Sequence, residues 1–203
     1  MFDRPAIKRF ARSQMQAQYG IALGTLLLLL LIASGLNSIT CGIGTFVLYP
    51  PLLVGYYLVY LKIFRGQKAA IGDLFSGFNQ FGRNLGGMLW MELWICLWSL
   101  LFFIPGIVKF YAYRLTPYIL ADSHKVSATE ALKLSMVMTE GHKGKIFLFE
   151  LSYIGWMLLS ALTCGLLLYF YVAPWMETGF AGVYDELKQQ AIARGLVDAS
   201  LFD

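Results

Sequence analysis

The stretch that decides the fold is residues 20–36, GIALGTLLLLLLIASGL, which carries no charge. A second apolar run, residues 42–63, follows the uncharged turn at residues 37–41 and contains one charged side chain, Lys62. A helix needs about 17–25 apolar residues to cross the hydrocarbon of a bilayer. Backbone polar groups cannot stay unpaired in lipid, and these runs lack the alternating pattern of barrel strands. The stretch therefore predicts a membrane-spanning helical hairpin.

Two further pairs of apolar runs follow the first. Their partners are separated by tight, uncharged turns at Pro105-Gly106 and Cys164-Gly165, where Gly and Pro interrupt helices. The predicted spans of these pairs are residues 85–104, 106–121, 146–164 and 166–184. With the first pair they predict an all-α membrane protein of six transmembrane helices arranged as three hairpins.

The composition agrees with a membrane protein. Hydrophobic residues make up 58% of the 203 residues and charged residues only 14%, against about 45–50% and about 25% in soluble domains. The net charge of +4 arises from basic clusters beside the apolar runs, where they suit anionic lipid headgroups, so it does not predict nucleic-acid binding. No linker divides the chain, which predicts a single polytopic domain over residues 1–203.

The basic residues predict the topology. All but two of the 16 Lys and Arg lie before the first pair, between pairs or after the last pair, when Lys62, the next-to-last residue of the second span, is counted with the group between pairs; the turns inside the pairs carry none. The exceptions, Lys109 and Arg114, lie within the short span at residues 106–121. Lys and Arg beside spans are retained in the cytoplasm. We therefore expect a multi-pass protein of the cell inner (cytoplasmic) membrane with both termini cytoplasmic.

The three pairs resemble copies of one unit. Each pair follows an amphipathic segment, and the second span of each contains a proline, at Pro51, Pro117 and Pro174. Such a pattern predicts a threefold parallel repeat about an axis along the membrane normal. The prolines either kink these spans and open a central cavity, or are tolerated as prolines commonly are in membrane helices. The predicted units are residues 1–64, 65–122 and 123–187, followed by a short cytoplasmic tail at residues 188–203.

The amphipathic segments are expected to be helices on the cytoplasmic side. In residues 73–83, Leu74, Phe78 and Phe81 share one face at helical spacing. Before the third pair, Ser127 and Glu130 form the sequence pattern of a capping box. The N-terminal segment likewise places apolar side chains opposite basic ones. These helices either lie in the headgroup plane or pack as lids on the bundle, and the sequence favours neither.

Several short motifs resemble a known bacterial family. They are DLFSGF at residues 73–78, IPGI at 104–107, PYILAD at 117–122, and ATEALKLS at 128–135 leading to GHK at 141–143. Their order and spacing resemble the integral membrane family called "domain of unknown function 975" over nearly the whole chain, most densely at residues 61–150. The resemblance implies a bacterial polytopic membrane protein and no particular activity. The chain is more distantly similar to membrane domains attached to some glycerophosphodiesterases, which hints at lipids.

Charged residues within the spans are the best candidates for a functional site, because each is costly to bury in lipid. The candidates are Glu92, Arg114, Glu150 and Glu177, whereas Lys109 is expected to snorkel to the outer surface. At about 1.5 Å per residue, three of them lie roughly 10 Å below the cytoplasmic boundary, which predicts that Arg114 pairs with Glu177 or Glu92. Such a cluster forms either a pocket for an ion, headgroup or small substrate, or a structural ion pair that fixes helix register.

The cysteines and histidines suggest little chemistry. Cys41 and Cys164 lie in outer turns on the oxidising side, where a disulfide is permitted, and neither belongs to the family-like motifs. His124 and His142 lack partners at metal-ligand spacing, and the sequence contains no phosphate loop or nucleophile elbow. We expect no metal, no cofactor and no enzymatic activity.

Three functions are compatible with these patterns. The first is a non-enzymatic scaffold or accessory subunit acting through the cytoplasmic helices. The second is a small transporter, channel or lipid-handling protein that uses the polar cluster in the inner leaflet. The third, an intramembrane enzyme, has no recognisable catalytic constellation. The expected partners are the lipid bilayer, anionic lipid headgroups and another membrane or cytoplasmic protein, but no nucleic acid.

Overall fold

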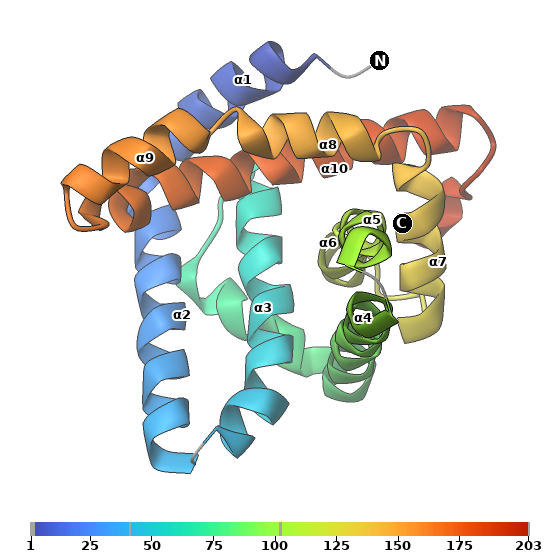
Figure 1. Cartoon of the computed structure of the whole chain (residues 1–203), viewed down its shortest axis with the longest axis horizontal. Coiled ribbons are helices and arrows are strands. Elements are labelled where there is room, and N and C mark those ends of the chain that lie inside the picture. The colour runs from blue at the N-terminus through green and yellow to red at the C-terminus, as the bar shows by residue number, and fades with distance from the viewer. Residues whose placement is uncertain (1–2, 41, 102, 203) are drawn as a thin grey trace.

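The computed structural model describes residues 3–40, 42–101 and 103–202, which fold into helices with no strand among them (Figure 1). The α-helices are α1 (Arg4–Ala17), α2 (Tyr19–Thr40), α3 (Ile43–Phe64), α4 (Phe81–Leu101), α5 (Phe103–Tyr113), α6 (Thr116–Asp122), α7 (Ala128–Thr139), α8 (Lys143–Leu151), α9 (Ile154–Leu162) and α10 (Ala173–Ala193). The shorter elements are the 3-10 helices η1 (Ile71–Gln80) and η3 (Ala199–Phe202) and the π-helical turn η2 (Leu168–Val172). The predicted all-α class is confirmed for these residues.

Within the described residues, three helical stretches are long and apolar enough to cross a membrane. They are Tyr19–Ser38, Gly44–Phe64 and Lys143–Leu162. The first two belong to α2 and α3, which form the predicted first hairpin (Figure 1). The outer sides of the hairpins expose large apolar residues, among them Leu31, Leu100 and Leu162 at 69%, 78% and 82%. Apolar patches of this kind mark surfaces that another apolar phase covers, and lipid does so for the hairpins of a membrane protein.

The fourth predicted span is interrupted near its proline, and the sixth changes from the π-helical turn η2 to α10 just before its proline. Pro117 and Pro174 were expected inside helices, but they lie in the first turns of α6 and α10, whereas Pro51 lies inside α3. Proline lacks an N–H and clashes with the carbonyl four residues earlier, so a helix restarts more easily than it continues. Before Pro174 that carbonyl belongs to Phe170, and it accepts a hydrogen bond of 2.5 Å from the Tyr19 hydroxyl.

One predicted turn was misplaced. Helix α4 ends at Leu101 and α5 begins at Phe103, so Pro105-Gly106 lies within the first turn of α5. The first four N–H groups of a helix have no intrahelical acceptor, so proline costs little there. A Cβ at Gly106 would lie 2.6 Å from the Ser99 hydroxyl oxygen, so this glycine allows α4 and α5 to approach closely. The turn predicted at Cys164-Gly165 is confirmed, with φ of 50° and 81°.

Helix α3 is the centre of the molecule and contacts α1, α2, α4, α6, α10 and η1. Where α3 packs against η1, the backbones of the two helices are in close contact. A Cβ at Gly55 would lie 1.9 Å from the Leu74 carbonyl oxygen, and a Cβ at Gly77 would lie 1.9 Å from that of Pro51. Gly77 is the glycine of the DLFSGF motif, so this close approach explains why this position of the motif is a glycine.

The hairpins run in three different directions. In Figure 1, α2 and α3 run from top to bottom, α8, α9 and α10 run across the top, and α4, α5 and α6 are seen end on. The order of elements repeats as predicted, because α1 precedes the first hairpin, η1 the second and α7 the third. The hairpins are therefore not aligned as parallel bundles, and the threefold repeat remains a prediction.

The three preceding helices pack on the hairpins. Helix α1 buries Ile7, Ala11 and Met15 against α10 and α3. η1 buries Leu74 and Gly77, and α7 packs on α4, α5 and α6. The predicted capping box of α7 is confirmed, because the Ser127 and Glu130 side chains and backbone N–H groups bond reciprocally at 3.4 Å. These contacts favour the lid hypothesis for the inner faces of the helices.

Candidate functional site

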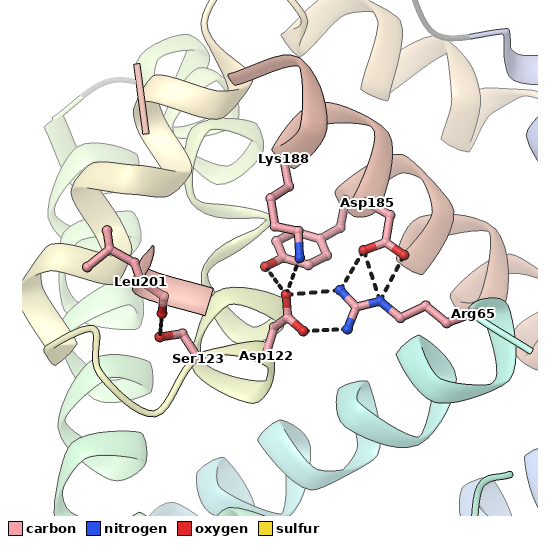
Figure 2. A network of polar contacts seen from close by, with 7 residues as sticks. Arg65, Asp122, Ser123, Asp185, Lys188 and Leu201 are labelled. Atoms are coloured by element: carbon pink, nitrogen blue, oxygen red, sulfur yellow. Dashed lines mark hydrogen bonds and ion pairs between the residues drawn. The ribbon is translucent and has the colours of Figure 1, made fainter. Parts of the chain in front are cut away.

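A network of charged side chains joins the end of α3, the end of α6 and α10 (Figure 2). Arg65 follows the last residue of α3, Asp122 ends α6, and Asp185 and Lys188 lie on α10. The Arg65 guanidinium binds both carboxylates: Nη1 and Nη2 lie 2.5 and 2.9 Å from the Asp122 oxygens, and Nε and Nη2 lie 2.6–3.2 Å from the Asp185 oxygens. We call these four residues the root network.

Asp122 is the centre of the root network. Besides Arg65, it accepts hydrogen bonds from Lys188 Nζ at 2.7 Å and from the Tyr184 hydroxyl at 2.9 Å. Its side chain is only 7% exposed, whereas that of Arg65 is 25% exposed. A planar guanidinium that binds two carboxylates through paired N–H groups fixes their orientation as well as their distance. One arginine thus links segments that are 57 and 120 residues away in the chain.

The electrostatics of the root network keep Asp122 and Arg65 charged. Burial acts to raise the pKa of Asp122, but the hydrogen bonds from Arg65 and Lys188 outweigh it and hold this pKa below its usual value. Burial acts to lower the pKa of Arg65, and its hydrogen bonds to Asp122 and Asp185 raise it above the usual value instead. The ion pairs therefore persist throughout the neutral range.

A second arginine binds the carboxyl end of α6. Arg83, in the first turn of α4, donates hydrogen bonds to the carbonyl oxygens of Leu120 at 2.5 Å, of Val126 at 3.1 Å and of Ser123. The last carbonyls of a helix have no intrahelical donor, so a cation placed there both satisfies and neutralises them. Arg83 thereby holds the backbone around Asp122, while Arg65 holds its side chain.

The intramembrane candidates predicted from the sequence form a looser cluster. Arg114 Nη2 lies 3.9 Å from Glu177 Oε1, and its Nη1 lies 3.3 Å from the Tyr57 hydroxyl. Tyr118 donates a hydrogen bond of 3.1 Å to the other oxygen of Glu177. The Arg114 and Glu177 side chains are each 13% exposed. Of the two partners expected for Arg114, the structure brings Glu177 into contact.

The other two candidates lie near this pair. Glu92 and Arg114 line one cavity of about 160 Å³, together with Tyr57, Tyr113 and Pro117. Water occupies about 30 Å³ in the liquid, so the cavity has room for several water molecules or a small ion. Glu150 is bound by a tyrosine instead, since the Tyr111 hydroxyl donates to it at 2.7 Å. The structure thus brings Arg114, Glu177 and Glu92 to one place and Glu150 beside it.

The structure does not test the disulfide that the sequence permits between Cys41 and Cys164. Cys41 lies outside the described residues, and Cys164 is exposed. Among the residues that the structure describes, no group of three His, Cys, Asp or Glu side chains has the geometry of a metal site.

The root network was missed from the sequence. Arg65 and Lys188 were used only as markers of topology, and Asp122 only as the last residue of the PYILAD motif. Its signal was a carboxylate at the end of an apolar helix, between basic flanks, where an unpaired charge is costly. No local pattern identifies its partners, because they come from α3 and α10.

The site and the fold define an all-helical protein with apolar helices of membrane-spanning length and a polar network at their ends. A family model, "Protein of unknown function (DUF975)", matches residues 105–191, from α5 to α10. The match confirms the resemblance to the domain of unknown function 975. It includes Arg114, Asp122, Glu177 and both α10 members of the root network. No curated protein and no solved structure match the chain.

Proposed function

We propose that this chain is a multi-pass protein of the cytoplasmic membrane that acts without chemistry of its own, as a scaffold or accessory subunit through α1, η1 and α7. The observation that carries this proposal is the root network, which ties all three hairpins together next to these helices. A network of paired charges fixes the helices relative to one another and gives a partner protein a rigid surface. The apolar outer sides of the hairpins then face lipid.

The root network also supports the proposed topology. Arg65 lies between the first and second hairpins, Asp122 between the second and third, and Lys188 after the third. Direct bonds among them support the placement of these three segments on the same side of the bilayer. Their basic character makes that side the cytoplasm. In the proposed topology each hairpin crosses the membrane and returns, which gives six spans.

The proposed threefold repeat is compatible with hairpins that point in different directions. A threefold axis relates three hairpins either when all run along it or when each is tilted from it by the same amount. The repeated order of one helix followed by a hairpin supports the second arrangement. The tips of the hairpins then diverge and their cytoplasmic ends meet at the root network.

Site-specific photo-crosslinking in intact cells tests the scaffold proposal. A crosslinking residue is placed at Gln16 on α1, Phe75 on η1 or Lys133 on α7, all exposed, and for comparison at the outward Leu100 and Leu162. We expect a discrete protein adduct from the first group that the second group does not give. Adducts with lipid alone at all five positions would contradict a scaffold role.

The cavity beside Arg114 favours a second candidate, a small transporter, channel or lipid-handling protein. The observation that favours it is that Arg114, the partner of Glu177, lines a cavity that Glu92 also lines. The test is ion and proton flux into liposomes that contain the purified protein. Flux that is lost in Arg114→Ala and retained in Arg114→Lys, with unchanged folding, supports transport. No flux above protein-free liposomes excludes an ion or proton channel.

A further inference from the structure

A basic groove lies on the outside of the molecule where α1 crosses the junction of α8 and α9 and the start of α10. Its volume is about 590 Å³. The side chains that line it include Arg4, Lys8, Arg9, Arg12, Ser152 and Trp175. Four of them are cationic and none is a carboxylate, so the groove has a strong positive potential. This groove is separate from the root network and from the cavity beside Arg114.

The position of α1 in the groove is fixed by α10 and by the turn after α8. The Trp175 indole N–H donates a hydrogen bond of 3.0 Å to the Lys8 carbonyl. The Lys8 ammonium donates to the Ser152 carbonyl and hydroxyl oxygens, each at 3.0 Å, and lies 3.9 Å from the centre of the Tyr153 ring. An ammonium has three N–H donors, and these contacts engage at least two of them. These contacts hold α1 and the Lys8 ammonium in place at the groove.

The cations at the rim are available to a ligand. In the part of the chain that the structure describes, no hydrogen bond or ion pair engages the guanidinium of Arg4 or Arg9. Arg12 lies over the rings of Tyr171 and Trp175, with its central carbon 5.6 Å from each ring centre. Guanidinium groups bind phosphate oxygens bidentately. The groove therefore offers convergent donors for an anion that carries oxygen atoms.

We infer that this groove binds the phosphate of an anionic phospholipid headgroup. Helix α1 ends at Ala17 and the membrane-length helix α2 begins at Tyr19, so α1 lies where the chain enters the bilayer. Basic residues at this level are attracted to anionic lipids, and tryptophan is enriched there because its ring is apolar and its N–H is polar. A lipid brings its phosphate and its acyl chains together, which suits a basic groove beside an apolar helix. This inference rests on the proposed membrane insertion, which places α1 at the headgroup level, but not on the scaffold role.

The test compares two variants that lose equal charge. The groove variant is Arg4→Gln/Arg9→Gln/Arg12→Gln, and the control variant is Lys68→Gln/Lys143→Gln/Lys145→Gln, whose side chains lie outside the groove. The detergent-solubilised full chain is titrated with short-chain phosphatidylglycerol, short-chain phosphatidylcholine or inorganic phosphate. Native mass spectrometry measures the bound species, and circular dichroism checks folding.

We expect phosphatidylglycerol to bind more tightly than phosphatidylcholine, and the groove variant to lose at least about tenfold in affinity for it. The control variant should keep its affinity within about twofold, since it leaves the groove intact. Equal losses in both variants would overturn the proposal in favour of general charge attraction. Inorganic phosphate bound as tightly as the lipid would overturn it in favour of a free anion.

A single substitution keeps the test decisive if the triple variant does not fold. Arg9 is exposed and its guanidinium has no partner to lose within the described residues, so Arg9→Gln should leave the fold unchanged. We expect it to weaken phosphatidylglycerol binding several-fold relative to Lys68→Gln. Identical affinities of these two single variants would contradict a site in the groove.

Discussion

The two charged clusters of this molecule are built in opposite ways. In the root network, Arg65 makes five hydrogen bonds of 2.5–3.2 Å to two carboxylates. In the intramembrane cluster, Arg114 approaches Glu177 only to 3.9 Å and borders a cavity. Both arginines join segments distant in the chain, but only the first has its geometry fully specified by its partners. The comparison indicates that the network at the ends of the hairpins holds the fold, and that the cluster inside tolerates change.

The largest expected effect is on the root network. Replacing Asp122 by Ala leaves Arg65 and Lys188 without their shared carboxylate, and loss of one partner from a buried ion pair costs about 3–5 kcal/mol. We expect the free energy of unfolding in detergent to fall by about 3 kcal/mol. Glu140→Gln, an exposed carboxylate at the end of α7, is the control and should stay near wild type. An Asp122→Ala protein as stable as this control would contradict the structural role of the network.

Next in size is the contact of η1 with α3. Because a Cβ at Gly77 would lie 1.9 Å from a backbone oxygen, Gly77→Ala must displace η1. Overpacking of this kind costs about 1–3 kcal/mol. A Cβ at Gly72, in the same 3-10 helix, would meet no other atom within 4 Å, so Gly72→Ala should be close to neutral. Chemical unfolding of the two variants measures the difference, and equal stabilities would show that the DLFSGF glycine is not needed for packing.

A smaller effect on stability is expected from a substitution in the cluster of Arg114 and Glu177. Arg114→Lys keeps the positive charge near Glu177 but loses the guanidinium contact with Tyr57. A lost hydrogen bond to a charged group costs about 1.5–3 kcal/mol of stability. Because the Arg114 contacts are long, we expect the loss in this variant to lie at the lower end of that range. The melting temperature in detergent measures it against Asp122→Ala. If Arg114→Lys proved the more damaging substitution, the roles assigned to the two clusters would have to be exchanged.

The smallest expected change is in the response to acid. The pKa of Asp122 is lowered in the folded protein, so its ionised form is favoured by folding. That stabilisation is fully present above the unfolded pKa of about 3.9 and is lost as the pH falls through the lower folded pKa. Melting temperatures measured from neutral pH to below pH 4 should therefore fall less steeply for Asp122→Asn than for wild type. Parallel curves would mean that Asp122 does not couple folding to protonation.

The parts of the fold that follow from local pattern could be predicted. Long uncharged runs indicated α2 and α3 within a few residues of their observed ends, and the capping box at Ser127 and Glu130 indicated the start of α7. Apolar runs do not reveal where a helix is interrupted, so the break between α5 and α6 at Arg114 was missed. An apolar run of a given length is compatible with one continuous helix and with two short helices.

The candidate site could be predicted only in part. Arg114 and Glu177 were selected because a charge within an apolar span is conspicuous and needs a partner at the same depth. The charges of the root network were not conspicuous, since they lie in segments where cations are expected. The directions of the hairpins decide which of these charges meet, and the sequence pattern does not contain those directions.

The account depends most on the cytoplasmic ends of the three hairpins meeting on one side of the membrane. Single cysteines at Lys68, Lys125 and Gln190, in a chain whose native cysteines are replaced, can be labelled in cells with a maleimide that does not cross membranes. The account predicts that all three react only after the cells are permeabilised, while a chain retaining only Cys164 reacts in intact cells. Labelling of any one of the three in intact cells, with the others protected, would contradict it.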